Sequence, residues 1–321
     1  MKKAETKYFI LDTVEKPGMK DKLRIFKCLV HSLWYQFIGA FVRTHSVEKK
    51  YKVAVCTIFK DEAIYLREWI EFNRVVGVEH FYMYNNNSSD NFSEVLMPYV
   101  EKGIVTLTDW PQNQAQMQCY QDCVEKYKDE AQWIGFIDAD EFIVPQTYES
   151  IYSFLKQFEK KRGAVKIHWK MFSSGGMLSR DTDGLVTEDF VVCWPKYSTL
   201  GKCFYNTNFD IDFGSVRNKA LHHTCWTRIN GPEFPPVNAL DRFCFGRGLR
   251  ISSHHHPIQI NHYYSKSYEE YKQKIIKGDV FHKVNPHDDA YFFLREQEGS
   301  AVDYSAYRYM LKTKLSLQNK N

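Results

Sequence analysis

The sequence predicts an α/β fold, a mixed, mostly parallel sheet flanked by helices, with an amphipathic helix before it. The first observation is the run YKVAVCTIF at 51–59, which is apolar along most of its length, as in a strand buried on both faces. The second is that strand-like runs alternate with helical spacings between residues 51 and 145. Such alternation implies parallel strands joined by helical crossovers, and ligands of these sheets bind at the carboxyl ends of the strands.

The elements follow in order along the chain. We expect strands at 51–59, 78–86, 103–110, 132–145 and 164–172, because each is rich in β-branched or aromatic residues. Apolar residues at helical spacing predict helices within 60–77, 88–103, 114–128, 268–278 and near 303–316. The alternation fades after about residue 145, so we divide the chain into 1–50, 51–150 and 151–321.

An amphipathic helix is expected at 22–43, where apolar residues recur every four positions at Ile25, Leu29, Leu33, Phe37 and Phe41. Polar residues interrupt this segment, and its apolar part is too short to cross a bilayer. Two interpretations remain open. The helix either docks on the following domain or makes a peripheral contact with an anionic membrane surface.

Composition narrows the class of protein. The net charge is +4, and no basic stripe with interleaved aromatic residues is present, so we expect no nucleic-acid partner. The eight cysteines form no CxxC pair, and residues 1–20 contain no apolar leader segment. We therefore expect a cytoplasmic protein, with a peripheral position on the inner face of the membrane if the 22–43 helix binds lipid.

Two carboxylates follow the expected strand that ends near residue 137. Asp138 and Asp140 are two positions apart, so in an extended segment they point to the same side. Paired carboxylates repel each other unless a cation lies between them, and oxygen ligands suit Mg²⁺ or Mn²⁺. The alternative is a solvated acidic turn, but the apolar residues on both sides favour the metal.

Five stretches together resemble the GT-A glycosyltransferases of the GT2-like and GT92 (DUF23) group. They lie at 53–90, 116–127, 133–142 (WIGFIDADEF), 168–176 (HWKMFSSGG) and 260–279. The resemblance implies that 51–150 binds a nucleotide-sugar and that 151–321 binds the acceptor. The donor would be a UDP-sugar, often UDP-galactose, and the cofactor Mn²⁺ (or Mg²⁺). The acceptor would be a glycan or a lipid-linked saccharide.

The resemblance also assigns site residues. Those expected to contact the nucleotide-sugar are Thr57, Phe59, Asp61, Glu62, Asn85, Asn86, Asp90, Gln116, Asp138 and, at a phosphate, Lys266. The metal would be held by Asp138, Asp140 and His262, with Glu141 in a supporting position.

The expected reaction is an inverting direct displacement, which needs a carboxylate base on the acceptor side. Glu188 and Asp189 are the candidates, with rivals at Asp181, Asp183, Asp210, Asp212 and Glu233. Two other functions stay open, a non-catalytic protein that binds sugar-nucleotides or glycans and a sugar-nucleotide hydrolase.

Overall fold

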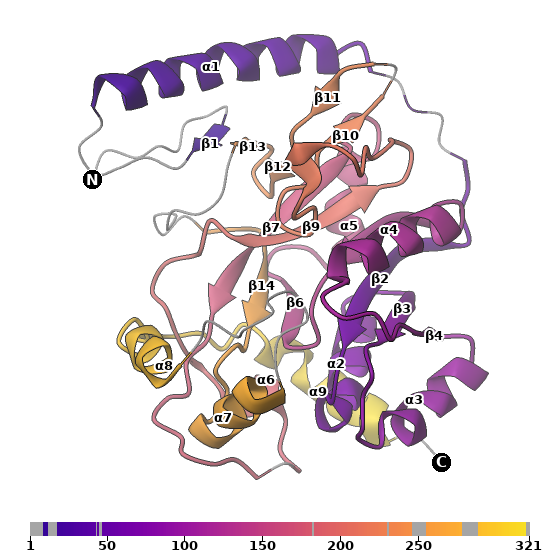
Figure 1. The fold of residues 1–321 in the computed structure, drawn as a ribbon, viewed down its shortest axis with the longest axis vertical. Coiled ribbons are helices and arrows are strands. Elements are labelled where there is room, and N and C mark those ends of the chain that lie inside the picture. The colour runs from indigo at the N-terminus through magenta and orange to yellow at the C-terminus, as the bar shows by residue number, and fades with distance from the viewer. Residues whose placement is uncertain are drawn as a thin grey trace.

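The computed structural model describes residues 9–11, 18–42, 44, 47–181, 183–229, 231–245, 255–277 and 288–318. Residues 1–8 and 12–17 of the expected N-terminal extension lie outside the described residues. Within this part, the fold is a large sheet with helices on both faces (Figure 1).

The main path of the sheet follows a single strand order. This order is β1 (Phe9–Leu11), β13 (Phe243–Phe245), β12 (Val237–Asn238), β7 (Ala164–Met171), β9 (Gly201–Asn206), β5 (Ala131–Phe136), β2 (Tyr51–Phe59), β3 (His80–Asn85) and β4 (Val105–Asp109). β5, β2, β3 and β4 are parallel, whereas β9 runs antiparallel to both β5 and β7. The prediction of a mixed, mostly parallel sheet flanked by helices is confirmed. The sheet also joins the 51–150 and 151–321 segments without a break.

Two further strands branch from the main path. β14 (Ile258–His262) pairs parallel to β7 and antiparallel to β6 (Glu141–Pro145). The expected strand at 132–145 is therefore two strands, β5 and β6, and the turn that separates them carries Asp138 and Asp140. Short two-stranded pairs are formed by β10 (Thr227–Arg228) with β11 (Glu233–Phe234), and by β8 (Val192–Cys193) with β15 (Ala301–Val302).

The predicted helices are present with approximately the expected bounds, and three further helices, at 151–155, 186–189 and 289–296, were not predicted. Together the helices are α1 (Met19–Gly39), α2 (Ala63–Val75), α3 (Phe92–Glu101), α4 (Gln116–Tyr127), α5 (Ile151–Leu155), α6 (Val186–Asp189), α7 (Tyr268–Lys277), α8 (Asp289–Glu296) and α9 (Tyr307–Gln318), with 3₁₀ turns η1 (Lys156–Phe158) and η2 (Val216–Asn218). Among the described residues, no helix combines the length and the apolarity that a membrane crossing requires.

Two apolar cores lie on the two faces of the sheet. Trp69 and Phe72 of α2 pack on one face with Val55 and Phe81. On the other face, α4 packs against a second core that contains Cys56. The cysteines at positions 28, 56, 119, 123, 193, 203, 225 and 244 are all buried and free.

One glycine explains how β9 approaches β5. Gly135 pairs with Phe204, and a Cβ at Gly135 would lie 2.3 Å from the Phe204 ring. The missing side chain therefore lets β9 lie against β5, and this pairing brings Lys202 of β9 next to the turn after β5.

The prediction for the N-terminal helix needs a correction. A four-residue spacing advances about 40° around an α-helix at each step, so Ile25 and Phe41 lie on different faces. Ile25 and Leu29 pack against the core of the domain, whereas Phe37 and Phe41 are exposed. The helix thus docks on the domain through one apolar face, and a second apolar face is exposed to solvent.

Candidate active site at the end of β5

The turn between β5 and β6 is fixed by a tryptophan from α2. The indole Nε1 of Trp69 donates to the carbonyl oxygens of Asp138, at 3.1 Å, and Glu141, at 2.8 Å. The backbone N–H of Asp138 donates to a carboxylate oxygen of Glu141 at 3.0 Å. The turn is therefore held from both sides, and its two aspartates leave it towards different partners.

Asp138 is oriented by side chains from α4 and β9. Its carboxylate lies 2.7 Å from the ammonium of Lys202 and accepts hydrogen bonds from Gln116, at 3.3 Å, and Tyr120, at 3.4 Å. The Asp138 side chain is one-third exposed, whereas Lys202 is fully buried. Gln116, which we expected to contact the nucleotide-sugar, thus lies beside Asp138.

Asp140, Glu141 and His262 form a buried group suited to a cation. One ligand atom from each lies within 4.8 Å of the others. β14 brings His262 there because its register places His262 directly opposite Glu141. The distance from His262 Nε2 to Asp140 Oδ1 is 3.5 Å, and that from His262 Nδ1 to Glu141 Oε1 is 4.0 Å. Asp138, which we expected among the metal ligands, is not part of this group, which contains Glu141.

The hydrogen-bonding state of this group fits a divalent metal. Glu141 Oε1 and His262 Nδ1 are buried without a hydrogen-bond partner. Burial lowers the pKa of His262 more than Asp140 raises it, so the imidazole is neutral and able to ligate. Two carboxylates and one imidazole form a donor set that Mn²⁺ accepts. The residues present therefore fit the metal that the sequence implied.

Lysines from α7 and the segment before it balance the acidic charge. Lys274 Nζ lies 2.6 Å from Asp140. Burial raises the pKa of Asp140, but Lys274 and His262 outweigh it and hold that pKa well below its usual range. Lys266 is buried, with its ammonium 4.0 Å from the centroid of the Tyr65 ring. Burial lowers the pKa of Lys266, although Glu62 and Asp140 oppose the shift.

The candidate nucleotide contacts at the ends of β2 and β3 lie side by side. Phe59 pairs with Asn85 in the parallel register. The hydroxyl of Thr57 is buried and has no hydrogen-bond partner. The amide of Asn85 donates to Asp109, and that of Asn86 donates to the carbonyl of Trp110 at 2.7 Å. The two asparagines thus connect β3 to the end of β4.

Asp61, Glu62 and Asp90 are engaged in contacts that shape the loop after β2. Asp61 accepts from the backbone N–H of Ser89 at 2.6 Å. Asp90 accepts from the backbone N–H of Ala63, the first residue of α2, at 2.8 Å. Glu62 is paired with Lys277 of α7, and its second carboxylate oxygen is buried without a hydrogen-bond partner. Of these three acids, Glu62 is the one with an unused buried acceptor.

Glu188 and Asp189 are in the short helix α6, and they point to different partners. Glu188 pairs with Lys314 of α9 at 2.7 Å. Asp189 lies 3.3 Å from Arg180, which in turn lies 3.2 Å from Glu270 of α7. Burial raises the pKa of Asp189 more than Arg180 lowers it. The structure therefore links Asp189, through Arg180 and Glu270, to the helix that carries Lys274.

Several residues around the site were not identified from the sequence. Lys202 and Lys274 contact Asp138 and Asp140, and His223 stacks edge-on against Trp169 with ring centroids 5.0 Å apart. A signal for Lys202 did exist, because a lysine inside an apolar strand is rarely buried without an acidic partner. His223 had no comparable signal.

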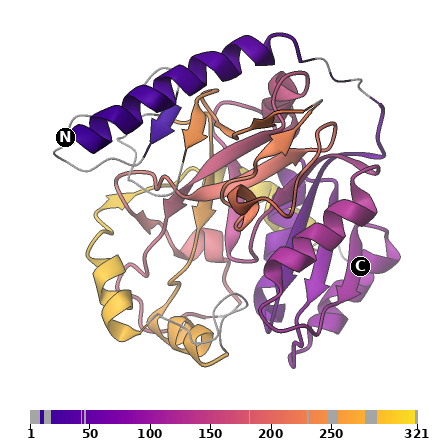
Figure 2. The ribbon, with the colours of Figure 1, turned by 45° about the horizontal axis from the view of Figure 1, so that its top comes forward.

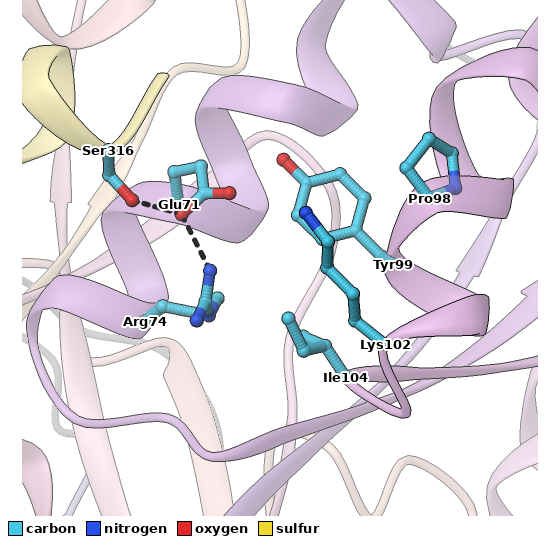
Figure 3. Close-up of a pocket in the computed structure, with 7 residues that line it drawn as sticks. All are labelled: Glu71, Arg74, Pro98, Tyr99, Lys102, Ile104 and Ser316. Carbon is cyan, nitrogen blue, oxygen red and sulfur yellow. Dashed lines mark hydrogen bonds and ion pairs between the residues drawn. The ribbon is translucent and has the colours of Figure 1, made fainter. Parts of the chain in front are cut away.

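A separate cavity of about 220 Å³ lies between α2, α3 and α9. Figure 3 shows the buried carboxylate of Glu71 with Arg74 and Ser316 bonded to it and the ring of Tyr99 nearby. Arg74 belongs to the last turn of α2 and Ile104 directly precedes β4. The cavity is therefore at the amino edge of the sheet, away from Asp140.

Sequence comparisons find relatives among plant glycosyltransferases. A glycosyltransferase family 92 protein of Oryza sativa subsp. japonica is 29% identical over 146 residues, 44% of this chain and 25% of that protein. One from Arabidopsis thaliana is 35% identical over 102 residues, 32% of this chain and 18% of that protein. A galactan beta-1,4-galactosyltransferase of Arabidopsis thaliana is 31% identical over 105 residues, 30% of this chain and 20% of that protein. The chain thus spans about a quarter or less of the length of these relatives.

Among solved structures, residues 1–349 of S. aureus TarS align with 84% of this chain and 75% of that chain. The TM-score is 0.36 and the sequence identity 10%, a likeness too low to carry function. The sequence profile described as glycosyltransferase family 92 matches residues 49–209, half of the chain, and includes both aspartates of the β5–β6 turn. The chain therefore belongs to glycosyltransferase family 92.

Proposed function

We propose that this chain transfers a hexose, with galactose favoured, from a UDP-sugar to a hydroxyl of a glycan or a lipid-linked saccharide. The observation that carries the proposal is the buried group of Asp140, Glu141 and His262 at the carboxyl end of β5 in a family 92 domain. The names of two relatives as galactan galactosyltransferases support galactose as the sugar.

A divalent ion held by Asp140, Glu141 and His262 would supply positive charge for a departing nucleoside diphosphate. The ammonium groups of Lys266 and Lys274 add charge from the protein itself, and both lie close enough to Asp140 to affect its pKa. Phosphate oxygens at this point would receive these ammoniums as point charges.

The nucleotide would lie over the ends of β2 and β3. The Thr57 hydroxyl and the second carboxylate oxygen of Glu62 are buried without partners, so both are available for hydrogen bonds to a ligand. Asp61 and Asp90 would act by holding the shape of this loop. The floor of the nucleotide site would be formed by Phe59, Asn85 and Asn86.

For the base, we favour Asp189 over Glu188. A base that accepts a proton from a hydroxyl works best when its pKa approaches the operating pH, and burial raises the pKa of Asp189. In the step itself, the acceptor oxygen attacks the anomeric carbon, Asp189 takes the hydroxyl proton, and the bond to the diphosphate breaks. Glu188 is instead held by Lys314 on the side of α9.

The deciding experiment compares Asp140→Asn with the wild-type protein against a panel of UDP-sugars and glycan acceptors in the presence of Mn²⁺. We expect transfer to fall roughly 100-fold or more, because charge stabilisation of the leaving group is lost. The matched control is Asp289→Asn, since the side chain of Asp289 is 47% exposed and pairs with Lys272 on the surface. This control should keep full activity.

The outcomes separate the candidate functions. Sugar transfer by the wild type that survives Asp140→Asn would remove the metal assignment. UDP release that is equally fast without acceptor would identify a sugar-nucleotide hydrolase. Binding of UDP, measured by calorimetry with and without Mn²⁺, in the absence of any turnover would identify a non-catalytic binding protein.

A further inference from the structure

The helix α1 is firmly docked on the domain through one face. On this face Cys28, Ser32 and Gly39 are buried. The ring of Tyr35 lies 5.6 Å from that of Phe243, measured between centroids, inside a cluster of aromatic rings. The side-chain oxygen of Gln36 accepts a hydrogen bond from the guanidinium of Arg162 at 3.3 Å. The orientation of the helix is therefore fixed, and so is the face that it turns outward.

The outward face is a stripe of large apolar side chains. It consists of Met19, Leu23, Phe26, Val30, Leu33, Trp34, Phe37 and, just beyond the helix, Phe41, each between 47% and 84% exposed. The ring centroid of Phe37 lies 6.1 Å from that of Trp34 and 5.2 Å from that of Phe41, so these three rings are neighbours. A continuous exposed apolar surface of this kind marks an interaction site, since it gains free energy when removed from water.

The charges beside the stripe have one sign. Lys20, Lys22, Arg24 and Lys27 are exposed, and the acidic residue of the helix is Asp21. On a helical projection, Lys20 and Lys27 lie roughly 80° to one side of the stripe, and Lys22 lies roughly 70° to the other. Long basic side chains at the borders of an apolar face can reach outward while their stems stay on apolar surface.

We propose that the apolar stripe of α1 lies in the plane of an anionic membrane surface. The apolar side chains would enter the boundary between headgroups and acyl chains, with Lys20, Lys22 and Lys27 among anionic headgroups. A second copy of the chain fits this surface less well. Two stripes packed together would bring the flanking lysines of both copies close to each other, whereas paired helices usually place opposite charges at their borders.

The helix α1 lies far from the candidate active site. α1 crosses one end of the molecule, and α7 with the carboxyl ends of β2 and β3 lies at the opposite end in both views (Figures 1 and 2). A protein that rests on lipid through α1 would therefore turn its active-site edge away from the lipid surface. The contact is an attachment, so its loss should leave sugar transfer to a water-soluble acceptor unchanged.

The test is flotation of the full chain with phosphatidylcholine vesicles, with and without phosphatidylglycerol. We expect the wild type to float with the anionic vesicles. Replacement of Phe26 and Phe37 by Glu should weaken binding roughly 100-fold, because two aromatic side chains that would be buried in the lipid are lost. Replacement of Lys22 and Lys27 by Gln should weaken binding to the anionic vesicles roughly 30-fold and reduce the preference for phosphatidylglycerol.

The matched control is Leu311→Glu, which makes the same kind of change at a residue of α9 that is at least as exposed as Phe26 and Phe37. This variant should float like the wild type, and all variants should share one thermal midpoint. The proposal is overturned if the wild type does not float, or if the Phe26 and Phe37 variant floats equally well. A wild-type dimer in light scattering that this variant converts to a monomer would assign the stripe to a second copy instead.

Discussion

Replacement of Lys202 by Met tests how the acidic turn is held together without added cation. Lys202 is fully buried in β9, and its ammonium lies 2.7 Å from Asp138 and 3.6 Å from Glu141. Methionine has a similar length and no charge. The change therefore leaves two carboxylates in one corner of the fold without the ammonium between them.

The magnitude follows from burial and distance. With an effective dielectric constant near 20, the two attractions amount to about 6 and 5 kcal/mol before the cost of desolvation. Desolvation of the ammonium cancels much of this, and loss of one partner of a buried pair typically costs about 3–5 kcal/mol. Asp138 is one-third exposed, so water screens its attraction to Lys202 and lowers its contribution to stability. We expect Lys202→Met to lose about 3 kcal/mol of unfolding free energy, the lower end of that range.

Glu141 sets an upper limit on the loss. Burial outweighs Lys202 and holds the pKa of Glu141 well above its usual range. A raised pKa favours the protonated form of Glu141, so removal of Lys202 leaves less unpaired negative charge in the fold. The loss should therefore be larger at high pH, where this proton is harder to keep.

The assay is urea unfolding with a chelator present, repeated with Mn²⁺. Because a cation can replace the charge of the ammonium, the gap between wild type and Lys202→Met should narrow in Mn²⁺. The matched control is Lys166→Met, since Lys166 is also buried in a strand but donates to the carbonyl of Thr199 at 3.4 Å. A Lys202→Met variant no less stable than Lys166→Met, with a gap that Mn²⁺ does not change, would refute the reasoning.

Two further predictions concern stability away from the site. Burial lowers the pKa of His80 from 6.5 to about 4, so the unfolded chain binds a proton that the folded chain does not. Stability should therefore fall by about 2 kcal/mol between pH 7 and pH 5, and His80→Gln should remove this part of the loss in urea titrations at the two pH values. Glu71→Ala should cost about 2 kcal/mol in the same titration, because Arg74 and Ser316 lose their shared acceptor, whereas Ser316→Ala should cost about 1 kcal/mol.

Much of the sheet could be predicted because its signals are local. Strand runs such as 51–59 and the helical spacings that follow them depend on the periodicity of neighbouring residues. The position of Asp138 and Asp140 after a buried strand is local in the same way. The break between β5 and β6 was not visible, because apolar residues continue on both sides of the turn.

The arrangement around the turn could not be predicted from local pattern. His262 reaches Glu141 through the register of β6 with β14, and a shift by one residue would turn it to the other face. Lys274 reaches Asp140 across 134 residues of sequence. The partners of Asp61 and Asp90 are likewise set by loop geometry. The sequence identifies these groups as polar but does not say whether they bind a ligand or one another.

The lysines around the turn change how its three acidic residues should be interpreted. In sequence, Asp138, Asp140 and Glu141 look like a concentration of negative charge that requires a metal ion. In the structure, Lys202 compensates Asp138 and Lys274 compensates Asp140, and the raised pKa of Glu141 favours its neutral form. The charges of the protein itself therefore nearly cancel in this turn. A divalent cation would bring excess positive charge into it, and the two negative phosphates of a UDP-sugar are the groups that could offset that excess. Metal and donor should thus favour each other's binding, because each supplies the charge that the other needs.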